Sequence, residues 1–305
     1  MSKRLISCCA SEMAALDRKG LLDAIAASEG RVLACETIGA LQPMLGDVTN
    51  AEFAASQGAD LLLLNLFDLD KPVLRGLPPC APDETIRTLK RLTGRPVGIN
   101  LEPAPLGRDT GDPWTLTPGR RATAQNALRA AAMGVDFILL TGNPGVGVAN
   151  PEIERALREL RAALGDRVVL AAGKMHASGV LAEAGRQIMT AADIDAFADA
   201  GADVLLVPAP GTVPGLTTEE VRALIARAHG LGRLAMTAIG TSQEGADTDT
   251  IRRIALACKM AGADIHHLGD AGYGGMALPE NIFAYSVAIR GVRHTYHRQA
   301  QSVNR

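Results

Sequence analysis

Two kinds of glycine-led opening alternate along the whole chain, each in front of a short apolar run. In the first kind, Gly-Arg or Gly-Asp-Arg precedes a run such as VLACET, and in the second, Gly-Ala-Asp or Gly-Val-Asp precedes a run such as LLLLN. Glycine suits the point where a helix stops and reverses into a strand, because it adopts the left-handed C-cap conformation without strain. In chain order the openings begin at Gly30, Gly58, Gly94, Gly134, Gly165, Gly201, Gly232 and Gly262.

The segments between these openings are rich in alanine and repeat apolar residues at helical spacing, as in TAQNALRAAAM. Apolar strands that alternate with helices indicate a parallel sheet covered by its helices. An open doubly wound sheet uses the same local pieces, but eight units with an internal repeat favour closure. We therefore predict an α/β protein, a single (β/α)₈ TIM-barrel domain over 1–305. An additional helix at about 11–28 precedes the barrel at about 30–290, and a C-terminal helical extension leads into a tail, 291–305.

Composition excludes several classes of protein. The net charge of -2 gives no basis for attracting nucleic acid or an anionic membrane. No unbroken run of 18 apolar residues occurs, and the N-terminus lacks a long apolar core, so we expect a cytoplasmic protein. The cysteines are odd in number and lack CxxC spacing, which argues against disulfides and against a zinc site. We expect no nucleotide cofactor.

Polar residues follow almost every predicted strand. In a barrel, the loops after the strands carry the chemistry, so these side chains are candidates for one shared site, although any strand end that meets water is polar. Strand alternation would point Asn100 and Glu102 to one side, and likewise Lys174 and His176. The candidate catalytic residues are Glu36, Asp68, Glu102, Lys174 and His176.

Two glycine-rich loops, GTSQEGAD and GDAGYGGM, follow the seventh and eighth strands. Each could offer backbone N–H groups to a phosphate or carboxylate, and barrels commonly hold a phosphate there, although such a loop can equally be a plain turn. The candidate substrate- and anion-binding residues are Asn65, Asn100, Thr141, Asn143, Thr212, Gly240, Thr241, Ser242, Gly269, Gly272 and Gly274.

Lys174 has three open roles: a Schiff base if burial lowers its pKa, a cation that pairs with a substrate anion, or a structural salt bridge. Carboxylates at several strand ends also suit Mg²⁺ or Mn²⁺, which prefer oxygen ligands, although solvated carboxylates are the plain alternative. The candidate metal ligands are Asp68, Asp70, Glu102 and Asp270. In His266-His267, one ring could be a ligand or proton carrier, while the other must face the helices.

Asp68-x-Asp70 after an apolar strand also matches the start of the haloacid dehalogenase phosphatases, in which the first aspartate is the nucleophile. Thr141, Lys174 and Gly269-Asp270 resemble their later motifs. However, Lys71-Pro72 replaces the Gly-Thr that lets their nucleophile loop turn, and a complete strand precedes the motif.

Over nearly its full length the chain resembles an uncharacterised bacterial family of (β/α)₈ barrels whose members are often labelled haloacid dehalogenase-like. The resemblance rests on LGDVTNAEFAASQGADLLLLNLFD, TGRPVGINLEP and GTSQEGADTDTI. More distantly, LAAGKMHASG and ADVLLVPAPGT are similar to the BtpA-type barrels, and the general layout is similar to phosphate-binding and phosphoenolpyruvate-utilising barrels. The resemblance implies a fold and little chemistry.

These patterns favour an enzyme of small-molecule metabolism that acts on a phosphorylated or carboxylated substrate by lyase, aldolase, isomerase or hydrolase chemistry. The alternatives are a phosphohydrolase with Asp68 as nucleophile and a non-catalytic ligand-binding barrel. Barrels of this size often associate, and the tail could pack on a second copy to give a homo-oligomer. A frayed, solvated tail is the simpler expectation.

Overall fold

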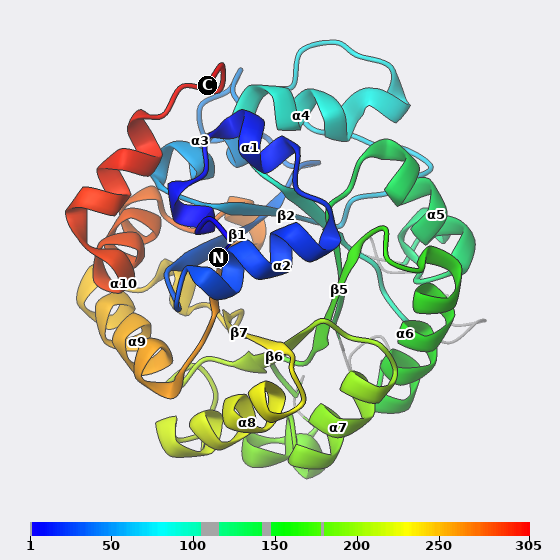
Figure 1. Cartoon of the computed structure of the whole chain (residues 1–305), viewed down its shortest axis with the longest axis vertical. Helices are drawn as coiled ribbons and strands as arrows, with labels where there is room; N and C mark the ends of the chain where they lie inside the picture. The colour runs from blue at the N-terminus through cyan, green and yellow to red at the C-terminus, as the bar shows by residue number, and fades with distance from the viewer. Residues whose placement is uncertain (1, 105–115, 142–147, 178–179) are drawn as a thin grey trace.

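The computed structural model describes residues 2–104, 116–141, 148–177 and 180–305. Eight parallel strands follow one another around a closed ring in sequence order, with β1 paired to both β2 and β8 (Figure 1). The predicted (β/α)₈ barrel is therefore confirmed. The strands are β1 (Val32–Ile38), β2 (Leu61–Asn65), β3 (Val97–Asn100), β4 (Phe137–Thr141), β5 (Val169–Gly173), β6 (Val204–Pro208), β7 (Leu234–Ile239) and β8 (Ile265–Leu268).

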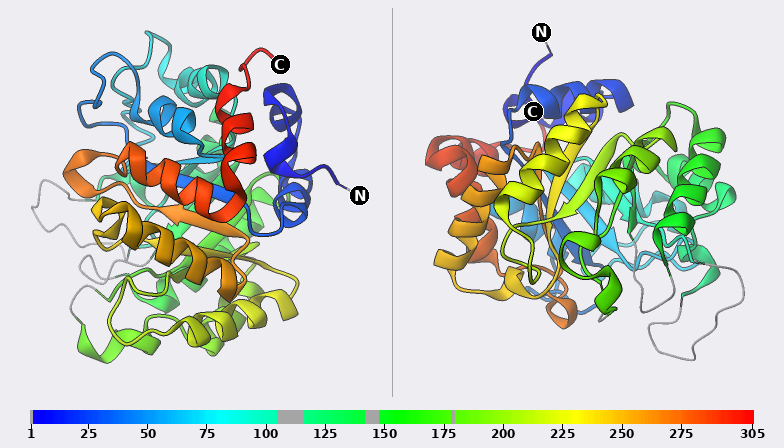
Figure 2. Two further views of the ribbon diagram at one scale, coloured as in Figure 1. Left: turned by 90° about the vertical axis from the view of Figure 1, so that its left-hand side faces the viewer. Right: turned by 90° about the horizontal axis from the view of Figure 1, so that it is seen from below.

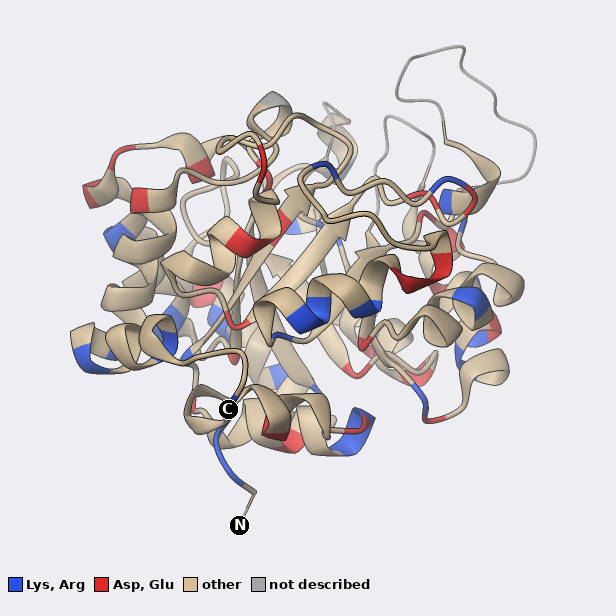
Figure 3. Ribbon diagram, turned by 90° about the horizontal axis from the view of Figure 1, so that it is seen from above, with Lys and Arg blue, Asp and Glu red and all other residues tan. Residues whose placement is uncertain are grey.

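Helices cover the outside of this ring and end where the glycines predict. Gly58 and Gly134 lie at helix C-termini with φ of 116° and 94°, the left-handed values that favour glycine. The helices of the barrel are α3 (Asn50–Gln57), α4 (Thr85–Thr93), α5 (Ala124–Met133), α6 (Asn150–Leu164), α7 (Ala191–Asp199), α8 (Thr218–Gly230), α9 (Thr248–Ala261) and α10 (Pro279–Ala300). Figure 3 shows acidic and basic segments interspersed over these helices.

The N-terminal segment closes the end of the barrel at which the strands begin. In place of one helix over 11–28, the structure has α1 (Ala10–Ala14) and α2 (Arg18–Ala27), separated where the Asp17 side chain accepts from Gly20 N and starts the second helix. Leu21 and Ile25 of α2 join the apolar cluster formed by inward-facing strand residues. Figure 2 shows both helices gathered at this end, so α2 plugs the barrel.

The C-terminal segment is docked rather than frayed, contrary to the simpler expectation. Helix α10 bends at Gly291, and beyond the bend Arg298 is completely buried. Arg298 and Arg290 bind the buried carboxylate of Asp60 at 2.8 and 2.5 Å. Burial alone would raise the pKa of Asp60, but these two arginines hold it below its usual value. The ion-paired cluster fixes α10 against the start of β2.

The inward-facing side chains of the strands form two layers inside the ring. The lower layer is apolar and includes Val32, Leu61 and Val169, all in the cluster that α2 covers. Residues further along the same faces are polar, as in Glu36 on β1 and Asn65 on β2, so polar groups gather at the carboxyl ends of the strands. Among the described residues, no helix is both long and apolar enough to cross a bilayer.

Candidate active site

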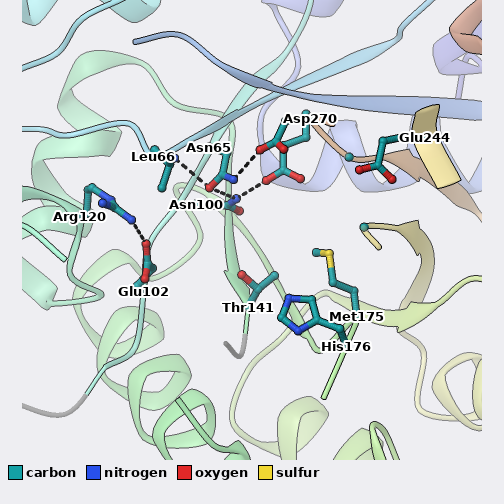
Figure 4. Close-up of a pocket in the computed structure, with 13 residues that line it drawn as sticks. Asn65, Leu66, Asn100, Glu102, Arg120, Thr141, Met175, His176, Glu244 and Asp270 are labelled. Carbon is teal, nitrogen blue, oxygen red and sulfur yellow. Dashed lines mark hydrogen bonds and ion pairs between the residues drawn. The ribbon is translucent and has the colours of Figure 1, made fainter. Parts of the chain in front are cut away.

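A cavity of about 300 Å³ opens at the carboxyl ends of the strands (Figure 4). Every strand except β6 contributes to it, either directly or through the segment that follows. The described residues that line it are Glu36, Asn65, Leu66, Asn100, Glu102, Arg120, Thr141, Met175, His176, Gly240, Glu244, Gly269 and Asp270. The structure therefore brings many of the predicted strand-end residues into one place.

Two asparagines connect two carboxylates across one side of this cavity. Asn100 Nδ2 donates to Glu36 Oε1 at 2.6 Å and to Asn65 Oδ1 at 3.1 Å. Asn65 Nδ2 in turn donates to Asp270 Oδ2 at 2.7 Å. The four side chains come from β1, β2, β3 and the segment after β8, so ring closure is what brings the first and last strands together.

Asp270 holds its proton more tightly than an ordinary aspartate. Burial, and then the negative charge of Glu36, raise its pKa to about 6 although Asn65 and the backbone N–H of Gly272 donate to it. A carboxyl group with a pKa near neutrality can both take up and release a proton during a reaction. Asp270 is therefore suited to general acid–base chemistry.

Glu244 adds a third carboxyl group to this side of the cavity. It lies in a 3-10 turn after β7, is only 5% exposed, and burial raises its pKa, with the charge of Glu36 adding to the effect. We define the acidic end of the cavity as Glu36, Glu244 and Asp270. Figure 4 shows Glu244 and Asp270 across the cavity from Thr141 and His176.

The two adjacent histidines of β8 face opposite ways, as alternation predicts. His266 points to the helices, where Nδ1 lies 3.0 Å from the Tyr285 hydroxyl and Nε2 lies 3.1 Å from the Gly30 carbonyl oxygen. His267 points into the barrel, fully buried, with Nε2 3.2 Å from Glu36 Oε2. That approach is not aligned for a hydrogen bond, so both ring nitrogens of His267 lack a hydrogen-bond partner among the described residues.

The opposite side of the cavity carries an ion pair between Glu102 and Arg120. The backbone fixes both partners, because Glu102 N donates to the Arg120 carbonyl and Ala122 N donates to the Glu102 carbonyl. Arg120 therefore comes from the segment that returns along the end of β3. We define the paired end of the cavity as Glu102, Arg120 and His176.

His176 and Lys174 follow β5 but occupy different positions. His176 lines the cavity, whereas Lys174 is 1% exposed and lies outside the described lining. Burial, and then the nearby charge of Lys174, lower the pKa of His176 below its usual value, which favours a neutral ring at pH 7.

The glycine-rich loops after β7 and β8 use much of their own hydrogen-bonding capacity internally. Gly269 N donates to the Ile239 carbonyl, Gly272 N to Asp270 Oδ1, and Gly274 N to the Ala271 carbonyl. The hydroxyl groups of Thr212 and Thr241 also have internal acceptors, the carbonyl oxygens of Ala209 and Thr212. Gly240 and Gly269 line the cavity, but the neighbouring carboxylates of Glu244 and Asp270 make this a poor place for a phosphate.

The other predicted residues divide between several places. Asp68 accepts the backbone N–H of Asp70 at 2.8 Å, and Asp70 pairs with Arg129 at 2.7 Å, both outside the described lining of the cavity. The four predicted metal ligands are thus not brought together. In the described ranges, no group of three or more His, Cys, Asp or Glu residues could hold a metal ion. Asn143 lies outside the described residues.

Sequence reasoning missed Arg120 and Glu244 as site residues. Arg120 follows a long connection after β3, where no strand pattern points to it. Glu244 lies within the GTSQEGAD loop, whose glycines and hydroxyls predict an anion site. The acidic residue in the middle of that loop is the sequence signal that argues against an anion-binding site.

The chain belongs to the family described as a domain of unknown function, DUF7916, whose model matches residues 6–305. No curated protein matches it. Among solved structures it is similar to an archaeal fructose 1,6-bisphosphate aldolase, with 13% identity, a TM-score of 0.55, and coverage of 86% of this chain and 95% of that one. It is also similar to 2,3-dimethylmalate lyase, a member of the PEP mutase/isocitrate lyase superfamily, with 15% identity, a TM-score of 0.53, and coverage of 84% and 82%. At such identities the likeness shows the barrel fold alone. These findings give no support to the haloacid dehalogenase-like label or to a bacterial origin.

Proposed function

We propose that this DUF7916 barrel is a metabolic enzyme that moves protons on a small carboxylated or phosphorylated substrate, in lyase, aldolase or isomerase chemistry. The observation that carries the proposal is Asp270. Its carboxyl group has a pKa of about 6, lines the cavity at the strand ends, and is joined through Asn65 and Asn100 to Glu36. Buried carboxyl groups whose pKa is shifted toward neutrality are typical of general acids and bases.

Two amide N–H groups fix the orientation of the Asp270 carboxyl group for the reaction. Asn65 holds one oxygen of Asp270 and the Gly272 N–H holds the other, so the carboxyl group cannot rotate freely in the cavity. Asp270 in its ionised form would take a proton from the substrate, and in its protonated form would return one. Removal of a proton beside a carbonyl group builds negative charge on the carbonyl oxygen, which needs a hydrogen-bond donor or a cation nearby.

The substrate's own negative group would lie at the paired end. Among the described residues that line the cavity, Arg120 is the one with a permanently charged cationic side chain. A guanidinium group matches the planar geometry of a carboxylate, and the acidic end would repel a carboxylate. Because the four predicted metal ligands are not brought together, we assign no step to a metal.

Deuterium incorporation tests this proposal without knowledge of the full reaction. The protein is incubated in D₂O with a set of small oxo acids, hydroxy acids, amino acids and phosphorylated ketoses, and loss of C–H signals is followed by NMR against an enzyme-free blank. We expect exchange at a carbon beside a carbonyl or carboxylate group, and a decrease of about 10²-fold or more in the rate with Asp270→Asn.

Asp68→Asn is the matched control, because it makes the same chemical change outside the described lining of the cavity. It should leave exchange unchanged. Release of phosphate from a generic ester that depends on Asp68 would instead favour the phosphohydrolase alternative. Binding of members of the set without any exchange would favour the non-catalytic barrel and overturn the proposal.

A further inference from the structure

We infer that the acidic end of the cavity binds an ammonium group, so that the substrate is a small amino acid. This inference names the substrate class and rests on the proposed function for its turnover, and on Arg120 for the position of the carboxylate. Two buried oxygen atoms and the balance of charge around them point to this ligand.

Two residues that line the cavity have a buried oxygen that accepts no hydrogen bond: Asn100 Oδ1 and Glu244 Oε2. The residues are 7% and 5% exposed. Buried polar atoms in native proteins are nearly always hydrogen-bonded, so an unpartnered pair beside a cavity indicates a ligand that completes them. Both atoms are acceptors. The missing group must therefore be a donor, which a carboxylate ion or a doubly ionised phosphate ester cannot be.

The orientation of Asn100 is fixed by its neighbours. Its Nδ2 donates to Glu36 Oε1 at 2.6 Å and to Asn65 Oδ1 at 3.1 Å. Rotating the amide by 180° would place its oxygen against the Glu36 carboxylate and lose both hydrogen bonds. The unpartnered atom is therefore the oxygen, so the ligand must donate a hydrogen bond to Asn100 as well as to Glu244.

Charge favours an ammonium group over a hydroxyl group. Three carboxyl groups form the acidic end, and Arg120 across the cavity already has Glu102 beside it. The other charged or titratable groups near the cavity are His267, 3.2 Å from Glu36, His176 on the far side, and Lys174, whose charge acts on His176. An ammonium ion offers three donors and one positive charge, whereas a hydroxyl group offers one donor and no charge.

Size and polarity together suggest an amino acid. The cavity of about 300 Å³ lies at the small end of the range for ligand sites. With an ammonium group at the acidic end and a carboxylate at Arg120, which Glu102 also contacts, a compact zwitterion would place each of its charges beside a group of opposite charge. A phosphorylated sugar would place its most negative group in a cavity with more acidic than basic residues.

Pairs of ligands that differ in one group test this directly. Binding of alanine and lactate, serine and glycerate, and aspartate and malate is measured by titration calorimetry, with inorganic phosphate as a further probe. We expect at least one amino acid to bind about tenfold more tightly than its hydroxy acid partner, because hydrogen bonds to a charged donor are stronger. Glu244→Gln should remove most of that preference, and Glu219→Gln, on the exposed face of α8, should preserve it.

Equal or tighter binding of the hydroxy acids or of phosphate would overturn the inference, as would the absence of binding by every amino acid of the set. A preference for amino acids that Glu244→Gln leaves intact would also overturn it. These outcomes are separate from the proposed function. Deuterium exchange on other compounds would leave the enzyme proposal standing, and amino acid binding without exchange would leave the ammonium site standing.

Discussion

The two ends of the cavity hold similar residues in opposite electrostatic situations. At the paired end, Glu102 faces Arg120, and the backbone fixes both. At the acidic end, Glu36, Glu244 and Asp270 act on one another through their charges, with amides and a buried histidine as neighbours. The first arrangement neutralises a carboxylate, whereas in the second, burial and then neighbouring negative charge raise the pKa values of Asp270 and Glu244. The position of a carboxylate at a strand end therefore does not by itself indicate a catalytic role, since its neighbours decide its chemistry.

The largest effect should come from breaking the paired end. Arg120→Gln removes the cation and leaves the Glu102 carboxylate, 18% exposed, without its partner. We expect a loss of roughly 3–5 kcal/mol in the free energy of unfolding, measured by urea denaturation. The double variant Arg120→Gln/Glu102→Gln should recover part of this loss. Glu244→Gln at the acidic end should cost little, because it leaves no charge unpaired; a loss as large as that of Arg120→Gln would remove the contrast between the ends.

Neutralising Asp270 should increase the free energy of unfolding, although it should decrease activity. Its pKa is about 6 in the folded protein, against 3.8 for an unperturbed aspartate, so the folded state releases this proton at higher pH than the unfolded chain does. The resulting cost develops as pH rises from about 4 to 6, is complete above 6, and amounts to about 3 kcal/mol. Asp270→Asn loses one hydrogen bond, worth about 1 kcal/mol. We therefore expect a net gain of about 2 kcal/mol at a pH of about 7.5.

The same variant provides its own control at low pH. At a pH of about 4, Asp270 is protonated in the folded protein, so Asp270→Asn should bring no gain there. Denaturation curves of both proteins at the two pH values check this. A gain that is equal at both pH values would show that charge is not the cause.

The smallest effect concerns His176 at the paired end. Lys174→Met should raise the pKa of His176, because it removes a positive charge that disfavours the protonated ring, although burial still holds the pKa down. Titration of the ring protons by NMR measures this. Lys90→Met, which removes a lysine paired with Asp136 before β4, should leave the His176 titration unchanged. An unchanged His176 pKa in Lys174→Met would show that the charge of Lys174 does not act on the His176 ring.

The fold could be predicted because its signals are local. Each glycine-led opening marks a helix end and a strand start, and eight such units define the ring. Strand alternation likewise predicts that only one of His266 and His267 faces the barrel interior. For Glu36, Asn65, Asn100 and Asp270, position at a strand end was enough to bring them to the mouth.

The remainder of the site depends on contacts that no local pattern encodes. Asp68 lies outside the described cavity lining because β2 ends at Asn65 and the chain turns at Leu66, which has a left-handed φ of 55°. Arg120 enters through a backbone pairing with Glu102 after a long connection. The glycine loops after β7 and β8 have the composition of an anion site, but several of their N–H groups bond within the loops.

The most direct test of this account is the titration of the Asp270 carboxyl carbon by ¹³C NMR, with its signal assigned by its loss in Asp270→Asn. Burial beside Glu36 predicts a pKa of about 6 in the intact protein. Glu36→Gln should lower that value, because it removes a neighbouring negative charge. A pKa near 3.8 in the unaltered protein would mean that the acidic end is solvated or neutralised, and both the acid–base role and the ammonium site would lose their basis.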